Sequence, residues 1–235
     1  GAKVTTAYEV ANSCRFNDND DARISKTFSS AGNSDTWTMS AWVKRCTLGA
    51  NSSIFTCNGL GAGAQKGTIR FDSSDKISAY VLYAGSAWHY ITSNAVYRDV
   101  SAWYHIVVRC DTTQSTDTDR LRLYVNGELQ TLSGSTYPDQ NEDTFFNEAE
   151  EHQVGSLIDE TEDGDMYLAE FCWIDGSSLA PTSFGEYDSD SPTIWKPIDV
   201  SGLTFGTNGV YLDFEDSSDL GTDASGNSDW TATNL

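Results

Sequence analysis

Residues 103–132, WYHIVVRCDTTQSTDTDRLRLYVNGELQTL, decide the fold class of this chain. Two runs in this stretch, 103–110 and 120–125, repeat with a period of two residues. That period is typical of half-buried β-strands, whose successive side chains point to opposite faces of a sheet. Asn126 and Gly127 then separate two short strand-like runs, and both residues tolerate the positive φ of a type I′ hairpin. The stretch therefore predicts an antiparallel meander.

The composition favours one all-β domain over residues 1–235. Seven Trp, eleven Tyr and ten Phe can fill a core between two sheets, and 19 Gly with only 4 Pro suit many tight turns. All-β folds of about 200 to 250 residues often form a single unit, and no linker divides the chain. We expect the core over about 8–215, with an acidic C-terminal tail at 216–235.

The charge is strongly acidic, with 35 Asp and Glu against 14 Lys and Arg and a net charge of −21. Such a surface repels phosphate backbones and anionic lipids, so nucleic-acid binding is not expected. Membrane insertion is not expected either, because no apolar run approaches the roughly 20 residues that span a bilayer. The first residues also lack the apolar core of a signal peptide.

The five cysteines have no C-x-x-C spacing, which argues against a zinc site or a redox motif. Cys110 and Cys172 lie in apolar strand patterns, where a free thiol behaves as a small hydrophobic group. A bridge between Cys46 and Cys57 is a minor alternative. The pattern favours folding in a reducing cytoplasm.

The remaining strands follow from the same alternation. Residues 36–45, TWTMSAWVKR, place Trp37 on an apolar face and Trp42 on the more polar one. We expect further strands at about 8–16, 67–72, 76–83, 88–93, 152–157, 166–174 and 210–214, and one short helical turn near Pro181.

Four motifs resemble, in this order, those of the laminin-G-like (concanavalin A-like) superfamily. They are TWTMSAWVKR at 36–45, AWYHIVVRCD at 102–111, RLRLYVNGEL at 120–129 and GDMYLAEFCWIDGSSLAP at 164–181. The resemblance covers about residues 10–185. It implies a two-sheet antiparallel jelly-roll sandwich, on which calcium is common.

Residues 15–45 and 205–227 resemble, more narrowly, laminin-G-like modules of marine bacteriophage virion proteins. That resemblance implies a tail-fibre or capsid-decorating protein on the virion surface, made in the host cytoplasm, with an extracellular location as the alternative. Its partners would be other virion proteins, further copies of this chain as a homo-oligomer, and a host surface glycan.

Catalysis is not expected from the acidic residues. Laminarinase-like enzymes of the superfamily place carboxylates on one strand as E-x-D-x-E, so that two of them lie about 5 Å apart. Asp213 and Glu215 supply only half of that pattern, and three His without G-x-S-x-G support no nucleophilic triad. We expect His105 to be a packed residue rather than a base.

Carbohydrate binding is better supported, because aromatic faces pack on the apolar face of a pyranose while amides and carboxylates bind its hydroxyls. The candidate ligand-binding residues are Trp42, Tyr83, Trp88, His89 and Tyr90. We therefore expect a structural and recognition module without catalysis. The alternatives are a purely architectural capsid or tail protein without a ligand, and a glycoside hydrolase.

Calcium is the only cofactor that the sequence suggests, because clustered carboxylate and amide oxygens are its ligands. One candidate group is Asp216, Asp219, Asp223 and Asn227, with Asp229 nearby, and the other is Asp159, Asp163 and Asp165, with Glu162 among them. Neither group has the spacing of an EF-hand loop.

Overall fold

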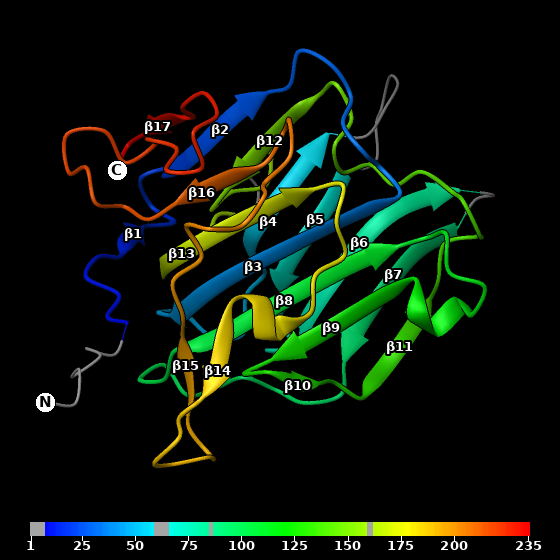
Figure 1. Ribbon diagram of the computed structural model, residues 1–235, viewed down its shortest axis with the longest axis horizontal. Coiled ribbons are helices and arrows are strands. Elements are labelled where there is room, and N and C mark those ends of the chain that lie inside the picture. Colours follow the sequence, from blue (N-terminus) through cyan, green and yellow to red (C-terminus); the bar gives the residue numbers. More distant parts are fainter. Residues whose placement is uncertain (1–7, 59–65, 85–86, 159–161) are drawn as a thin grey trace, which may run out of the picture.

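The computed structural model describes residues 8–58, 66–84, 87–158 and 162–235, and these form two antiparallel sheets packed face to face (Figure 1). The seven-stranded sheet has the order β1-β13-β3-β8-β9-β10, and β16 also pairs with β13. Its strands are β1 (Cys14–Phe16), β3 (Thr36–Arg45), β8 (Tyr104–Asp111), β9 (Leu121–Val125), β10 (Glu128–Leu129), β13 (Met166–Asp175) and β16 (Val210–Leu212). The all-β jelly-roll sandwich expected from the sequence is confirmed.

The eight-stranded sheet has the order β11-β7-β6-β5-β4-β12-β2-β17. Its strands are β2 (Arg23–Thr27), β4 (Ser52–Asn58), β5 (Lys66–Phe71), β6 (Ile77–Ala84), β7 (Ala87–Ser93), β11 (Leu132–Thr136), β12 (Glu151–Val154) and β17 (Thr231–Thr233). β17 pairs with β2 and Trp230 is only 3% exposed, so residues 216–235, expected as the acidic tail of the single domain, pack against the rest of it. They complete the sheet and its core.

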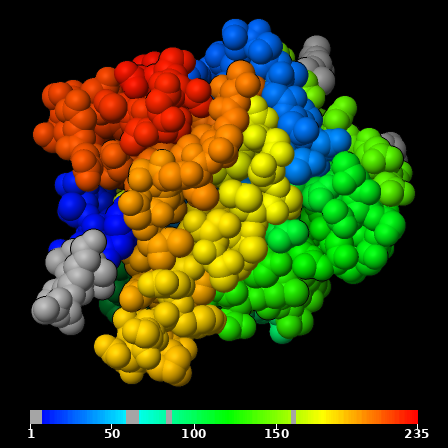
Figure 2. Space-filling view, in the orientation of Figure 1, coloured from blue at the N-terminus to red at the C-terminus, as the bar shows by residue number. Residues whose placement is uncertain are grey.

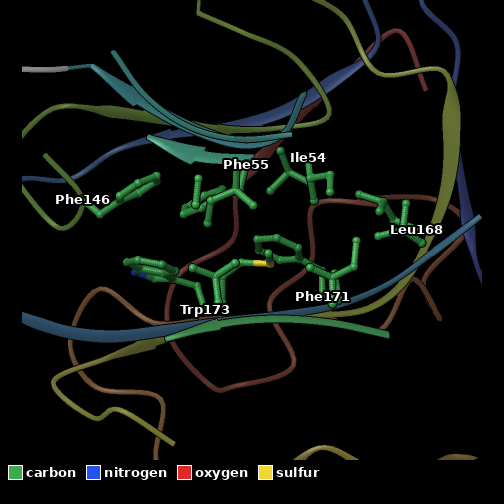
Figure 3. Close-up of a cluster of buried hydrophobic side chains, with 14 of the residues drawn as sticks. Ile54, Phe55, Phe146, Leu168, Phe171 and Trp173 are labelled. Carbon is green, nitrogen blue, oxygen red and sulfur yellow. The ribbon is translucent and has the colours of Figure 1, made fainter. Parts of the chain in front are cut away.

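Strand alternation places the main core between the sheets. Trp37, Met39, Ala41 and Val43 of β3 are all fully buried there, as the sequence predicts. In Figure 3, Ile54 and Phe55 project from the eight-stranded sheet toward Leu168, Phe171 and Trp173 of the opposite sheet. Burial of large aromatic rings of this kind supplies most of the favourable free energy of such a sandwich.

The long segment at 137–150 contains no helix or strand. It sends Phe146 into the core, where its ring lies 5.0 Å from that of Trp37. The neighbouring Asn147 is fully buried, and its Oδ1 accepts a hydrogen bond of 2.8 Å from Nε1 of Trp173. A buried amide costs free energy unless it is paired, so these contacts hold the segment in one place.

The central hairpin forms at the residues that predict it. Asn126 and Gly127 have φ of 49° and 81°, and they connect β9 to β10. Asn126 Oδ1 also accepts a hydrogen bond of 2.8 Å from the backbone N–H of His105, which ties the turn to β8.

Two minor expectations need correction. The helical turn near Pro181 is present as η2 (Pro181–Ser183), but a second turn, η1 (Asp117–Asp119), forms in the polar loop before β9, where no helix was expected. All five cysteines are free thiols, so Cys46 and Cys57 do not form the bridge kept as an alternative. No helix in the described residues is long and apolar enough to cross a bilayer.

A second apolar layer covers the outer face of the seven-stranded sheet, meaning the face turned away from the eight-stranded sheet. It is built by residues 176–209, which include β14 (Gly185–Tyr187) and β15 (Trp195–Pro197). This segment is yellow and orange in Figure 2, where it spreads across the middle of the molecule. Its buried cluster comprises Val107, Tyr124, Cys172, Ile174, Phe184, Val200, Phe205 and Tyr211. The sheet is therefore buried on both faces over much of its area.

Candidate functional site

A β-bulge in β13 shapes the outer face of the seven-stranded sheet. Ala169 pairs with Trp42 and Cys172 pairs with Ser40, so β13 has one residue more than β3 between these two pairs. The extra residue is Glu170, which takes φ of 49°. Such a bulge re-aims side chains, and both Ala169 and Glu170 lie toward the outer face here.

Trp42 stands on that outer face between a histidine and an alanine of the neighbouring strands. Its ring stacks on His105 of β8, with centroids 4.8 Å apart and an interplanar angle of 21°. On β13 its partner is Ala169, whose methyl group leaves space beside the indole. A pocket of about 290 Å³ occupies this space, which we call the small pocket; it is lined by Val10, Ala11, Asn12, Ser13, Trp42, Trp103, Ala169 and Pro197.

His105 of β8 supports the ring of Trp42 that stacks on it. The imidazole ring is fully buried, Nε2 lies 2.9 Å from Oγ of Ser40, and Nδ1 accepts a hydrogen bond of 2.8 Å from Nε1 of Trp195. Because Nδ1 is the acceptor, the neutral ring carries its proton on Nε2 and donates it to Ser40. Burial lowers the pKa of His105 to about 3, so the ring stays neutral at ordinary pH. The expectation of a packed histidine is therefore confirmed.

Trp195 lies between two glycines that allow close packing of the β14–β15 hairpin on the sheet. A Cβ atom on Gly127 would lie 2.6 Å from the indole, and one on Gly185 would lie 2.7 Å from it. The hairpin also borders a second, larger pocket of about 570 Å³. This large pocket is lined by Trp42, Trp103, Asn126, Glu128, Tyr187, Pro192, Thr193 and Trp195.

The two pockets meet at Trp42 and Trp103, which line both of them. We call the two pockets together the Trp42–Trp103 groove. Trp103 is 36% exposed. Trp103 was not predicted as a site residue, although the sequence contains a signal for it. Trp103 precedes His105 by two residues, which places both side chains on the face that carries Trp42.

Polar groups line one side of the groove. Asn126 uses Oδ1 to bind the backbone of His105, and its Nδ2 has no partner among the described residues. Glu128 accepts a hydrogen bond from the hydroxyl of Tyr187 on Oε1, which leaves Oε2 free for another donor. Neither residue was predicted as a ligand-binding residue. The groove thus combines flat aromatic surfaces with one amide and one carboxylate.

Beside the small pocket, Glu170 is held by two phenols. Its Oε2 accepts hydrogen bonds of 2.6 Å from Tyr211 and 3.0 Å from Tyr8. Burial raises the pKa of Glu170, although the two phenols act in the opposite direction, and burial also raises the pKa of Tyr8 to about 12. These bonds anchor the segment that continues into the wall of the small pocket at 10–13.

The other predicted ligand-binding residues lie on the opposite sheet and do not join Trp42. Tyr90 of β7 stacks on Tyr80 of β6, with ring centroids 5.2 Å apart, and Trp88 meets the same ring edge-on at 5.5 Å. His89 is only 9% exposed, and its Nδ1 lies 3.0 Å from the carbonyl oxygen of Tyr137. Tyr83 pairs with Trp88 in the sheet, but its side chain lies outside the described residues.

Comparison with known families identifies the fold. A family model described as the concanavalin A-like lectin/glucanases superfamily matches residues 16–161, which is more than half of the chain. The chain belongs to this superfamily. The sequence matches none of the curated proteins with which it was compared.

Several solved structures resemble this member of the superfamily. A native heptameric SAP-like pentraxin from Limulus polyphemus has 15% identity and a TM-score of 0.53, with 74% of this chain and 80% of that chain covered. The IT-sialidase CBM40 of Ruminococcus gnavus, bound to α2,3-sialyllactose, has 12% identity, a TM-score of 0.42, and coverage of 57% and 71%. Trypanosoma rangeli sialidase in complex with sialic acid has 16% identity and a TM-score of 0.44; 63% of this chain matches 22% of that enzyme. At these identities the likeness concerns the fold alone.

The acid pair that might have formed half of a glucanase ladder lies in a turn. Asp213 follows the end of β16, and its Oδ1 accepts a hydrogen bond of 3.0 Å from the backbone N–H of Glu215. Phe214 between them has φ of 58° and is buried. The two carboxylates therefore do not share one strand face, as the glucanases of this superfamily require.

The predicted calcium ligands at 216–227 form hydrogen bonds with groups of the protein. Asp216, Asp219 and Asp223 each accept backbone N–H bonds from a residue two positions later, and Asn227 donates to the carbonyl oxygens of Gly206 and Gly209. Asp223 also accepts the N–H of Tyr211, and its Oδ2 is buried without a partner. The carboxylates of this group thus stabilise separate turns.

The second acidic group is engaged with protein partners as well. Asp165 forms an ion pair with Arg15 and accepts a hydrogen bond from the Thr47 hydroxyl. Asp163 accepts a hydrogen bond of 2.6 Å from Ser156, while Asp159 lies outside the described residues. Over the described part of the chain, no three His, Cys, Asp or Glu side chains are arranged to hold a metal ion. These residues do not fit a calcium site as they stand, and calcium stays an untested prediction of the sequence.

Proposed function

We propose that this chain is a non-catalytic carbohydrate-recognition module and that it binds glycans in the Trp42–Trp103 groove. The observation that supports this proposal is the arrangement of indoles around two joined pockets, with Asn126 and Glu128 beside them. Indole faces pack on the apolar face of a pyranose ring, and the amide and carboxylate can bind its hydroxyl groups.

The dimensions of the groove suit an oligosaccharide. The small and large pockets measure about 290 and 570 Å³, whereas ligand sites commonly measure about 300 to 1,000 Å³. Trp42 is also held in place before any ligand arrives, because its ring rests on His105, which is fixed by Ser40 and Trp195. A pre-ordered aromatic surface loses little side-chain entropy on binding.

The biological setting that we propose is a bacteriophage particle, in which the chain acts as a fibre or surface-decorating protein that meets host glycans. The narrower sequence resemblance of residues 15–45 and 205–227 supports this setting. Mass spectrometry of purified particles would test whether the chain is a component of the virion. Light scattering of the isolated protein would test whether it forms a homo-oligomer. Absence of the chain from particles would contradict the first, and a monomer would contradict the second.

Binding can be tested with a glycan array followed by titration calorimetry on the best ligand. Trp103→Ala removes a partly exposed wall of the groove, so we expect affinity to fall at least about tenfold, since stacking side chains of this kind dominate binding sites. Trp88→Ala removes an indole from the opposite sheet and serves as the matched control, with unchanged affinity. Equal losses in the two variants, or no glycan bound by the native protein, would contradict the proposal.

The same titration with EDTA tests the calcium prediction. Binding that requires calcium should disappear with EDTA and return when calcium is restored in excess. Binding that is indifferent to EDTA would remove calcium from the recognition step.

A further inference from the structure

The small pocket differs from the large one in its chemistry. Apart from the shared indoles, its lining consists of Val10, Ala11, Ala169 and Pro197, with Asn12 and Ser13 as the polar members. Asn12 and Ser13 are exposed, and their side chains make no hydrogen bond with another described residue. The small pocket thus offers an apolar space beside an amide and a hydroxyl that are free to bind.

The groove carries negative charge and no compensating cation. Glu128 is the only carboxylate among the residues lining the two pockets, and none of those residues is Lys, Arg or His. The basic residue next to Pro197 is Lys196, which already forms ion pairs of 3.3 Å with Glu186 and Asp188. An anionic sugar would therefore lose hydration in the groove without gaining a partner of opposite charge among the lining residues.

We propose, building on the glycan-binding function above, that the groove selects neutral glycans carrying an N-acetyl group. The pyranose ring packs on Trp42 and Trp103, and the acetamido group enters the small pocket. Its methyl group contacts Val10, Ala11 and Ala169, while Asn12 and Ser13 bind the amide. The match is specific to a substituent that has both an apolar end and a polar amide, which a bare hydroxyl lacks.

The bulge at Glu170 makes this assignment possible. Because it turns Ala169 and Glu170 to the same face, the methyl group of Ala169 forms the floor of the small pocket. Tyr8 binds Glu170 and so keeps the 10–13 segment at the edge of that floor. The selectivity thus depends on the position of this segment and on the small size of Ala169.

Paired probes test the selectivity directly. N,N′-diacetylchitobiose and cellobiose differ in the acetamido groups, and cellobiouronic acid and cellobiose differ in one carboxylate. We expect the acetylated probe of the first pair to bind at least about tenfold more tightly, since one well-placed methyl group contributes about that factor. In the second pair we expect the probe with the carboxylate to bind more weakly, and Glu128→Gln to narrow that difference in affinity.

Two variants fill the small pocket. Ala169→Val adds volume at its floor, and Ala11→Trp adds an indole at an exposed position. In both variants we expect the ratio of affinities for the first pair to approach one, whereas Trp88→Ala should keep the native ratio.

The outcomes separate the two proposals. If no glycan binds anywhere on an array, the glycan-binding function itself fails. If glycans bind but acetylated and plain sugars bind equally, or a 6-deoxy sugar binds best, the N-acetyl selectivity is wrong while the glycan-binding function stands. If an anionic sugar binds best, the preference for neutral glycans is wrong while the glycan-binding function stands.

Discussion

Nε1 of Trp195 donates a hydrogen bond of 2.8 Å to Nδ1 of His105, and this bond connects the β14–β15 hairpin to the middle of the seven-stranded sheet. Trp195→Phe keeps the aromatic bulk but leaves the buried Nδ1 without a donor. We expect the free energy of unfolding to fall by about 1–3 kcal/mol, the usual cost of a buried unsatisfied polar group. Urea denaturation measures it. The indole of Trp103 makes no hydrogen bond within the described residues, so Trp103→Phe should change the free energy of unfolding by less than about 0.5 kcal/mol. Equal effects would contradict the role of this bond.

Stability should decrease when the pH falls below about 6.5. Burial lowers the pKa of His105 to about 3 and that of His152 to about 4, whereas both rings take up a proton near pH 6.5 in the unfolded chain. The unfolded state therefore binds more protons between these limits, and each ring costs about 1.4 kcal/mol per pH unit there.

Urea denaturation at pH 8, 7, 6 and 5 checks this prediction. These two rings should add no pH dependence between pH 8 and 7, and a double His105→Gln and His152→Gln variant should show a smaller decrease between pH 6 and 5. Burial acts to raise the pKa of Asp75, but hydrogen bonds from Arg98 and Arg45 lower it overall. Asp75 should therefore add a loss of stability only below about pH 4. A native protein equally stable at pH 6 and 5 would contradict the assignment of neutral buried rings.

Gly127→Ala should destabilise the protein for two reasons. The residue has φ of +81°, and the added Cβ would lie 2.6 Å from the ring of Trp195. Forcing a residue with a Cβ into that conformation costs about 1–3 kcal/mol. Gly202→Ala is the matched control, because its Cβ would meet nothing within 4 Å. Thermal unfolding of both variants, side by side, gives the difference; equal midpoints would show that the hairpin does not depend on this close approach.

Tyr211 and Tyr8 both bind Glu170, and removing each hydroxyl group in turn should lower the free energy of unfolding by different amounts. Tyr211 is 5% exposed and donates across 2.6 Å, so we expect Tyr211→Phe to cost about 1–3 kcal/mol of unfolding free energy. Tyr8 is less buried and donates across 3.0 Å, so Tyr8→Phe should cost about 0.5–1.5 kcal/mol. Chemical denaturation of the two variants measures both values, and the reverse order would contradict this view of Glu170.

Local patterns were sufficient for much of the fold. The alternation in 36–45 assigned Trp37 to the core and Trp42 to the other face, and Asn126-Gly127 located the hairpin. These features depend on residues close in the sequence, where period and turn chemistry are strong signals. The superfamily motifs added the two-sheet architecture.

The site depended on contacts between distant residues, and these could not be predicted from one sequence. Trp42 was expected to join Trp88 and Tyr90, but the strands that carry them belong to different sheets. The bulge at Glu170 changes which side chains of β13 face Trp42, and no turn residue or proline marks it. Trp195 lies 90 positions from His105 in the chain, and no periodicity connects the two.

The Trp42–Trp103 groove has a floor from central strands and walls from the 10–13 segment and the β14–β15 hairpin. Floor and walls are therefore encoded by separate parts of the gene. A designer could exchange residues 186–194, between the packing glycine and the anchoring tryptophan, to alter which sugar is accepted while the sandwich is left intact. In that sense this chain offers a scaffold for engineered lectins.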